Sequence, residues 1–563
     1  MDVTKSHTRN VVTNKKEVEL GKGIAIASTD YNSKIKELLD DELLGLLVEL
    51  HQELEPERQA LLRQRKIRQS NFDEGKLPDY LNSNNEAVTS DWQVKTLPED
   101  LKKRRVEITG PVNSAKMVIN MLSRNDDGLR ADMAMLDFED SMKPTWGNVV
   151  DGFYNVIGAA RGDLRFEQPG GNGTPSKSYE IDADDMPGVM VRCRGLHLDE
   201  EHLTIDGEPV AGGLFDLAVT FYHAAQLLVS RGRTPKYYVP KCESYREARW
   251  WNKLFGMLEE EMGFETGTLR ATFLIETLTA AFQVEEILYE IKDHAAGLNV
   301  GRWDKIFSDI KVLRYHKDRV MPDRSTIDMS KPWMDQYARR LIKICHSRGA
   351  MAIGGMSAFT PGKDAELRKK QTAKVRADKK NEHDIGHDGC WVSHPYFITS
   401  ALECFPEDNQ LDRRLPDQDK YPDLLPVGGG AVTEAGLRTN IRVGIAYMQG
   451  WNEGIGCVAW DNLMEDLATL EISRAQIWQW IHHKVMLADG RRVSRELVDQ
   501  LFDEELQKIL GEIDEVMQGA SDEVITKTKA QFSKARQDVG AVFSLENLPD
   551  FFHTALNEIN HKN

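Results

Sequence analysis

Short apolar runs alternate with helical patterns through the middle of the chain. The runs are rich in β-branched and aromatic residues, and segments with the 3.6-residue period of an amphipathic helix separate most of them. Alternation of strands and helices predicts a parallel sheet. Eight such units predict a (β/α)8 TIM barrel, whose active site forms at the carboxyl ends of its strands. The runs are residues 104–112, 133–140, 188–195, 236–244, 269–277, 297–304, 350–356 and 389–395.

The regions before and after these eight runs have different hydrophobic patterns. An apolar stripe over residues 33–68 predicts an amphipathic helix, and the strongly helical pattern after residue 433 predicts a second helical region packed over the barrel mouth. The Gly- and Pro-rich insertion 162–187 predicts a surface loop. We therefore divide the chain into an N-terminal helical segment with its linker (1–100), a TIM-barrel domain (101–404), a linker (405–432) and a C-terminal helical domain (433–563).

Two neighbouring runs each end on an acid. The run ATFLIE ends on Glu276, and GLNVGRWD ends on Asp304, 304 − 276 = 28 residues later. This spacing is that of one strand–helix–strand unit, so both carboxylates are expected at the same end of adjacent strands. Mg²⁺ takes oxygen ligands and leaves positions open for substrate, so the pair is a candidate magnesium site. The alternative is a helix cap at Glu276 and a surface salt bridge at Asp304.

Further charged residues stand where active-site groups are expected. Asp137 and Glu139, in DFED, are candidates for orienting metal ligands, or caps for the next helix. Alternation in VMVRCRG puts Arg192 and Arg194 on one face, where arginine suits an anionic oxygen that forms during a reaction. A salt bridge to the DFED acids is the alternative. Asp466 opens a helical segment, and by itself it is typical of an acid stabilised by the helix dipole.

Composition narrows the possible partners and location. The net charge of −18 argues against binding to nucleic acid or an anionic membrane, and no apolar run approaches the length of a membrane span. Six dispersed cysteines without a C-x-x-C pair indicate reduced thiols. The first residues lack the apolar core of a secretory signal, and the last residues are not a peroxisomal tripeptide. We therefore expect a cytoplasmic protein.

Longer stretches of the chain resemble one family. KDHAAGLNVGRWDKIF (292–307) closely resembles the signature of malate synthases of the A-type branch. DFEDSMKPTWGN, VRCRGLHLDE, CHSRGAMAIGGMSAF, GHDGCWVSHP and NLMEDLATLEISRAQIWQWIHH resemble further blocks of that family, in the family's order, between about residues 100 and 490. The resemblance implies a Mg²⁺-dependent condensation of acetyl-CoA with glyoxylate, which gives malate and CoA in the glyoxylate cycle.

The resemblance also implies roles for particular residues. Glu276 and Asp304 resemble the Mg²⁺ ligands of the family. Backbone amides from Gly301 to Asp304, with Trp303 among them, are implied to hold the carboxylate of glyoxylate. The whole stretch would then bind and polarise the aldehyde, but it contains no base.

The remaining roles fall on other parts of the chain. Asp466 resembles the residue that removes a proton from the acetyl methyl group, and Arg192 the arginine that stabilises the enolate and contacts glyoxylate. Met356 and Pro395 match positions near the CoA site. Two other functions stay open: a malyl- or citramalyl-CoA lyase on a related barrel, and a non-catalytic relative that binds CoA. The long C-terminal region favours the synthase over the lyase, and the complete set of acids and arginine argues against a simple binding protein.

Overall fold

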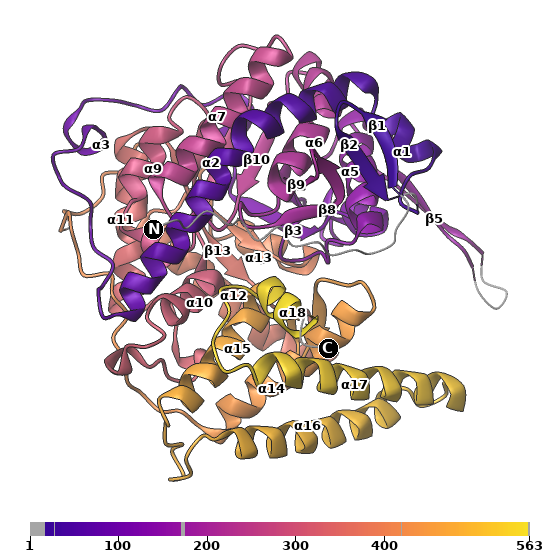
Figure 1. Ribbon diagram of the computed structural model, residues 1–563, viewed down its shortest axis with the longest axis vertical. Coiled ribbons are helices and arrows are strands. Elements are labelled where there is room, and N and C mark those ends of the chain that lie inside the picture. Colours follow the sequence, from indigo (N-terminus) through magenta and orange to yellow (C-terminus); the bar gives the residue numbers. More distant parts are fainter. Residues whose placement is uncertain (1–16, 28, 171–174, 418, 561–563) are drawn as a thin grey trace, which may run out of the picture.

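Eight parallel strands form a closed barrel in the computed structural model, which describes residues 17–27, 29–170, 175–417 and 419–560 (Figure 1). Each of the eight predicted runs overlaps a barrel strand, so the predicted TIM barrel is confirmed. In order around the barrel, the strands are β3 (Val106–Pro111), β4 (Met133–Asp137), β7 (Gly188–Arg192), β10 (Lys236–Val239), β11 (Arg270–Ile275), β12 (Ala295–Val300), β13 (Met351–Ser357) and β14 (Gly389–Val392), which pairs with β3 again.

Side chains fill the barrel, which is therefore a packed core and not a pore. Large residues such as Met135, Met190, Tyr238 and Trp391 form the inner cluster, and helices cover the outer face of the sheet. Burial on both faces explains why the strands have continuous apolar sequences and not alternating ones. At Gly389, a Cβ atom would lie 1.7 Å from the Arg104 carbonyl oxygen, so only glycine allows β14 to approach β3 and close the barrel.

Helices surround the barrel. One of them, α6, has the length and mean hydropathy (1.2) of a membrane-spanning helix, but 72% of its most apolar window is buried inside the protein, which is typical of a core helix. The helices of this region are α4 (Ala115–Met121), α5 (Trp146–Arg161), α6 (Gly212–Ser230), α7 (Tyr245–Glu261), α8 (Leu278–Ala281), α9 (Val284–Glu290), α10 (Arg302–Val312), α11 (Pro332–Ser347), α12 (Ala365–Ile385) and α13 (Ile398–Leu402).

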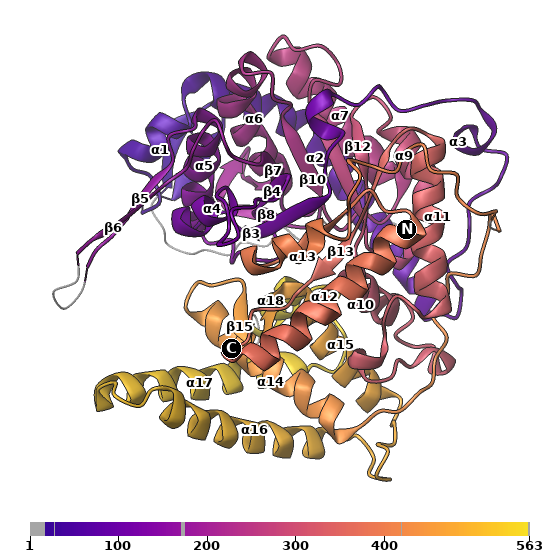
Figure 2. The same cartoon turned by 180° about the vertical axis from the view of Figure 1, so that it is seen from behind.

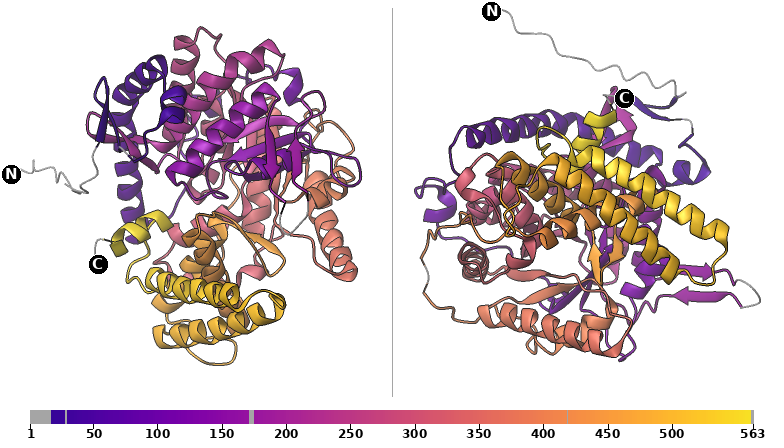
Figure 3. Two further views of the ribbon diagram at one scale, coloured as in Figure 1. Left: turned by 90° about the vertical axis from the view of Figure 1, so that its right-hand side faces the viewer. Right: turned by 90° about the horizontal axis from the view of Figure 1, so that it is seen from below.

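The N-terminal region contains helices and strands. Helices α1 (Ser33–Leu38) and α2 (Asp41–Asp73) lie where the helical pattern was predicted, and the long α2 lies along the outside of the barrel (Figures 1 and 3). The short α3 (Glu86–Thr89) lies in the segment that was expected to be a linker. The strands β1 (Glu17–Gly21) and β2 (Ile24–Ala27) were not predicted. They are short, and their antiparallel sheet is completed only by the distant β8 (Asp199–Ile205) and β9 (Glu208–Ala211), so local sequence carries little signal for them.

Part of the predicted surface loop is a hairpin. Strands β5 (Arg165–Gln168) and β6 (Lys177–Glu180) pair antiparallel and project away from the barrel (Figure 2). The chain ends on which the expectations about targeting signals rest, residues 1–16 and 561–563, lie outside the described residues.

A C-terminal helical layer lies against the mouth of the barrel, as predicted. It has its own apolar core, and its helix α15 packs on the barrel helix α10. The right-hand view of Figure 3 shows this layer in front of the barrel. Its elements are α14 (Glu434–Asn452), the hairpin of β15 (Val458–Trp460) and β16 (Leu463–Glu465), α15 (Leu467–His482), α16 (Arg495–Val516), α17 (Asp522–Phe543) and α18 (Phe552–Asn560).

Candidate active site

A cavity of about 70 Å³ lies where the carboxyl ends of the barrel strands meet the start of α15. Most of the predicted site residues line it, although they come from widely separated parts of the sequence. The predicted residues in its wall are Arg192, Glu276, Gly301, Trp303, Asp304, Met356 and Asp466. Of the other predicted residues, Asp137 and Glu139 are buried behind the wall, and Pro395 lines a neighbouring cavity.

The two candidate metal ligands lie on adjacent strands, as their spacing predicts. Glu276 follows β11 directly, and Asp304 lies in the first turn of α10, which begins after β12. The two residues are 2% and 7% exposed. A Cβ atom on Gly301 would lie 2.4 Å from the Glu276 Cβ atom, so the missing side chain of Gly301 lets the two strand ends approach each other.

The charges at this site fit a divalent cation. Burial raises the pKa of Glu276 and raises that of Asp304 well above its usual range, because it removes the water that stabilises a carboxylate, and the Lys241 ammonium opposes both shifts only in part. The Oδ1 atom of Asp304 is buried and accepts no hydrogen bond. Among the described residues, no three His, Cys, Asp or Glu side chains converge on a common metal position. Two carboxylates nevertheless suit Mg²⁺, which is commonly bound by one or two carboxylates with water and substrate oxygens.

The start of α10 offers donors for an anion. Gly301 precedes its first residue, and no side chain caps this end of the helix. The first backbone N–H groups of a helix have no partner within the helix, and the helix dipole favours negative charge beside them. The residues from Arg302 to Asp304 therefore present amides next to the two candidate metal ligands.

Asp137 holds Arg192 in place. Arg192 Nε donates to Asp137 Oδ1 and Arg192 Nη2 to Asp137 Oδ2, both at 2.6 Å. Asp137 also accepts hydrogen bonds from the Glu139 amide and the Ser141 hydroxyl. This is the salt bridge that the sequence left as an alternative, and it directs Asp137 to Arg192 and not to the candidate metal ligands. The same contact fixes the guanidinium in the cavity wall.

Arg194 does not share the site, and the prediction that it shares a face with Arg192 is wrong. β7 ends at Arg192, so the alternation of a strand does not continue to Arg194. The Arg194 guanidinium is buried against Asp216 and Glu200, each at 2.8 Å, and it does not line the cavity.

Lys241 is a site residue for which no role was predicted. Its Nζ atom lies 2.5 Å from Glu139 Oε1, 2.7 Å from Asp140 Oδ2 and 3.3 Å from Asp304 Oδ1. Lys241 therefore bridges Glu139 and Asp304. Lys241 lies near the end of the predicted run 236–244 and Asp140 ends DFED, but a polar residue at a strand end is too common to mark either one as functional.

Asp466 enters the cavity from the C-terminal layer. It is the N-cap of α15, and its Oδ1 atom accepts a hydrogen bond from the Thr469 amide at 3.3 Å. The helix-start interpretation is therefore correct, and the same residue also lines the cavity. Burial raises the pKa of Asp466 to about 7, and the negative charge of Asp140 adds to the rise, whereas Arg192 opposes it. A carboxylate with a pKa near neutral is suited to act as a general base.

A second cavity of about 660 Å³ adjoins the first. Both are lined by Thr109, Gly110, Met117, Ser393 and Met464. The second cavity also contains Pro395, the exposed ring of Tyr396 and the cationic side chains of Arg124 and Arg368. Asp126 and Asp127 also line it, so its charge is mixed. The cavity has room for an extended molecule that reaches the smaller cavity with one end.

A closed parallel barrel with charged residues gathered at its carboxyl ends places this protein among the TIM-barrel enzymes. Three family models match the chain: "Malate synthase, N-terminal domain" at residues 28–86, "Malate synthase, TIM barrel domain" at 188–421, and "Malate synthase, C-terminal" at 431–557.

Full-length relatives agree with the family models. The chain is 43% identical to malate synthase A of Escherichia coli over 493 residues, which are 86% of this chain and 90% of that protein. It is 44% identical to malate synthase of Myxococcus xanthus over 495 residues, 87% of this chain and 89% of that protein. A solved malate synthase from Haloferax volcanii has 14% identity and a TM-score of 0.43, over 78% of this chain and 99% of that one. The chain belongs to the malate synthase family.

Proposed function

We propose that this protein condenses acetyl-CoA with glyoxylate and water to give malate and CoA, with Mg²⁺ as its cofactor. The observation that carries the proposal is the convergence of three kinds of group on one small cavity. A carboxylate pair comes from the barrel, an arginine from a third strand, and a carboxylate with a raised pKa from the helical layer. Family membership supplies the two substrates.

Glu276 and Asp304 are the residues that would hold Mg²⁺. When bound, the ion neutralises the carboxylate of glyoxylate and polarises its aldehyde as a Lewis acid. The amides at the start of α10 donate to the carboxylate of glyoxylate and fix its orientation beside Trp303. These contacts expose the aldehyde carbon to the rest of the cavity.

Asp466 and Arg192 act on acetyl-CoA. The Asp466 carboxylate removes a proton from the acetyl methyl group, and the electron pair of that C–H bond moves to the thioester oxygen as an enolate. The thioester methyl group is a very weak acid, so this step requires a positive partner for the enolate oxygen. Arg192 provides it, because its guanidinium keeps donors that Asp137 does not use.

The remaining steps form the product. The enolate carbon attacks the aldehyde carbon of glyoxylate, and a C–C bond forms while the aldehyde π pair moves to its oxygen. This oxygen takes a proton from water to become the hydroxyl group of a malyl thioester, and Asp466 releases its own proton to water. Water then cleaves the thioester and releases malate and the CoA thiol. Asp466 belongs to the 433–563 region and the other groups to the barrel, so turnover requires α15 to stay docked against the mouth.

The second cavity is the proposed site for the rest of acetyl-CoA. Met356 lines the inner cavity, and Pro395 the outer one. With its acetyl group beside Asp466 in the inner cavity, CoA would extend past the residues that line both cavities and place its nucleotide end in the outer one. There, Arg124 and Arg368 offer positive charge to its phosphates.

A product assay separates the synthase from the lyase alternative. The protein is incubated with Mg²⁺, acetyl-CoA and [2-¹³C]glyoxylate, and carbon NMR follows the labelled carbon while a thiol reagent follows free CoA. Malate and free thiol in a one-to-one ratio are expected. Accumulation of a malyl thioester without thiol would assign a lyase. Folded protein that consumes no glyoxylate would refute the proposal.

A further inference from the structure

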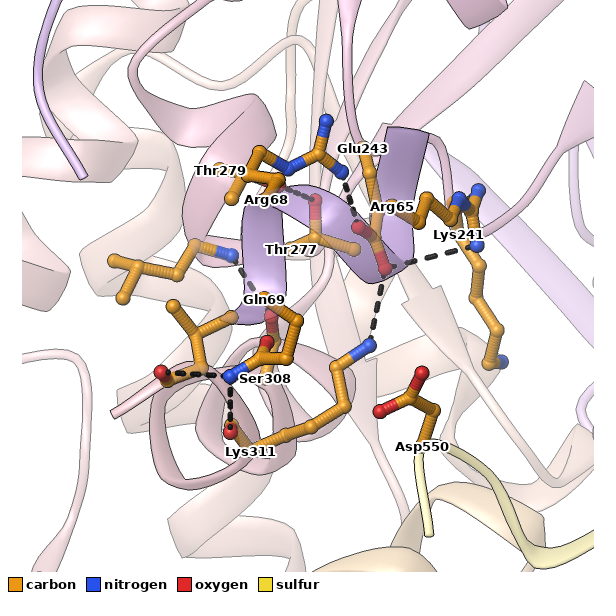
Figure 4. Close-up of polar contacts among 12 residues, drawn as sticks. Arg65, Arg68, Gln69, Lys241, Glu243, Thr277, Thr279, Ser308, Lys311 and Asp550 are labelled. Carbon is orange, nitrogen blue, oxygen red and sulfur yellow. Dashed lines mark hydrogen bonds and ion pairs between the residues drawn. The ribbon is translucent and has the colours of Figure 1, made fainter. Parts of the chain in front are cut away.

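An arginine of the N-terminal helix α2, Arg65, lies beside Lys241 (Figure 4). Arg65 is 7% exposed. Its Nε atom donates to Glu247 Oε1 at 2.8 Å, and its Nη2 atom donates to Glu247 Oε2 at 2.6 Å. The same Nη2 atom donates to the main-chain carbonyl of Lys241 at 2.8 Å, across 176 residues of sequence. One planar group thus joins α7, α2 and the end of β10.

Lys241 has a backbone conformation that requires such support. Its φ angle is +52°, in the left-handed region that residues other than glycine rarely adopt. Two hydrogen bonds hold the peptide groups on either side of it. The Lys241 amide donates to Glu276 Oε1 at 2.7 Å, and its carbonyl accepts from Arg65. Glu276 belongs to the site itself, so Arg65 is the contact that comes from outside the barrel.

This conformation decides where the Lys241 ammonium group lies. Its Nζ atom sits among Glu139, Asp140 and Asp304. If the backbone relaxed to negative φ, the side chain would turn to another direction and its amide would leave Glu276. The acids around the candidate metal position would then lose their shared cation and one hydrogen bond at the same time.

Other side chains of α2 bind α10 and the loop that follows β10, and not Lys241. Arg68 contacts Glu243, which also lies 3.0 Å from the Lys311 ammonium of α10. Gln69 donates to the Val312 carbonyl of α10 at 3.1 Å. Figure 4 shows these contacts beside Arg65. They attach α2 to the barrel, as does a longer contact of 3.6 Å between Arg65 Nη1 and Glu243 Oε1. Within the described part of the chain, Arg65 is the α2 side chain that donates a hydrogen bond to Lys241.

We propose that Arg65 is a positioning residue of the active site, which holds Lys241 in its left-handed conformation and thereby keeps the Lys241 ammonium among the acids of the site. The proposal rests on the proposed function, because the rate of that reaction reports the state of the acid cluster. It assigns the N-terminal helix a part in catalysis through a single main-chain contact.

A double-mutant cycle tests this inference. The variants are Arg65→Met, Lys241→Met and both together, with Gln69→Ala as a matched control on the same helix. Thiol release is measured with Mg²⁺ and acetyl-CoA while glyoxylate is varied. Arg65→Met is expected to lower kcat/KM for glyoxylate about 10–100-fold, the usual range for a residue that orients the ligands of a metal site. Lys241→Met is expected to lose at least as much, and Gln69→Ala to keep the wild-type rate.

The activity of the double variant decides whether Arg65 acts through Lys241. If Arg65 acts through Lys241, the two losses do not multiply, because in Lys241→Met the ammonium is already absent and the second change removes only the support of the Lys241 amide at Glu276. Losses that multiply, or an Arg65→Met rate equal to that of Gln69→Ala, would overturn the inference. An inactive wild-type protein would count against the proposed function instead.

A conservative variant covers the case in which Arg65→Met does not fold. Arg65→Lys keeps a positive charge beside Glu247 but lacks the fork that reaches both Glu247 and the Lys241 carbonyl. It is expected to unfold at the wild-type temperature and still to lose activity several-fold. Full activity in a folded Arg65→Lys protein would also overturn the inference.

Discussion

Replacing Arg192 by lysine tests the electrostatic part of the proposed reaction. A guanidinium carries five N–H donors. Asp137 accepts from Nε and from Nη2, each at 2.6 Å, and the other donors belong to a group that lines the cavity. Lysine keeps the charge, but its single nitrogen cannot hold Asp137 in a fork and also donate to an enolate oxygen.

The expected loss follows from comparable sites. Removing one donor to an oxyanion costs about 10²–10³ in kcat, which corresponds to about 2.7–4 kcal/mol of transition-state stabilisation. Arg192→Lys is therefore expected to lower kcat about 10²–10³-fold. The protein should still fold, because Asp137 keeps its hydrogen bonds from the Glu139 amide and the Ser141 hydroxyl.

Arg194→Lys is the matched control. It makes the same substitution two residues later, at a side chain that is buried to a similar degree but pairs with Asp216 and Glu200 outside the cavity. Thiol release at saturating substrates gives kcat for both variants, and thermal unfolding shows whether each is folded. The reasoning would be refuted if Arg192→Lys lost less than about tenfold, well short of a lost oxyanion donor, or if Arg194→Lys lost as much.

Four further results are expected. The carboxylate of Asp466 is the active form and its pKa is about 7, so kcat/KM should rise with pH up to about 7 and then level; a flat profile from pH 5.5 to 8 would contradict this. Gly301→Ala, whose Cβ atom would lie 2.4 Å from the Glu276 Cβ atom, should raise the Mg²⁺ concentration needed for half-maximal rate and lower the unfolding temperature, because the two strand ends must move apart. Chelation by EDTA should abolish thiol release, and added Mg²⁺ should restore it. Glu107→Ala would leave fully buried Arg104 unpaired, so urea unfolding should show a loss of about 3–5 kcal/mol.

The barrel could be predicted because its signal is local and repeated. Each strand is buried on both faces and gives an apolar run, and each run has a helix after it. The pair Glu276 and Asp304 follows from the same regularity, since consecutive parallel strands end at the same edge. The sheet of β1 and β2 with β8 and β9 could not be found in this way, because its halves are short and lie far apart in sequence.

The site was only partly visible for the same reason. Asp466 looks like an ordinary helix start, and only the docking of α15 on the barrel makes it a candidate base. The position of the Lys241 ammonium depends on a left-handed backbone angle and on Arg65 of a distant helix, and neither can be predicted from the local sequence. The prediction for Arg194 was wrong because it extended the alternation of a strand two residues past the end of β7.

The central claim is that the barrel binds glyoxylate and the C-terminal layer supplies the base. The most direct test compares the wild-type protein with Asp466→Asn, using thiol release from acetyl-CoA for turnover and calorimetric titration with glyoxylate in the presence of Mg²⁺ for binding. We predict that the variant releases no thiol above background and binds glyoxylate with nearly the wild-type affinity. Turnover at the wild-type rate, or loss of glyoxylate binding in a folded variant, would contradict the claim.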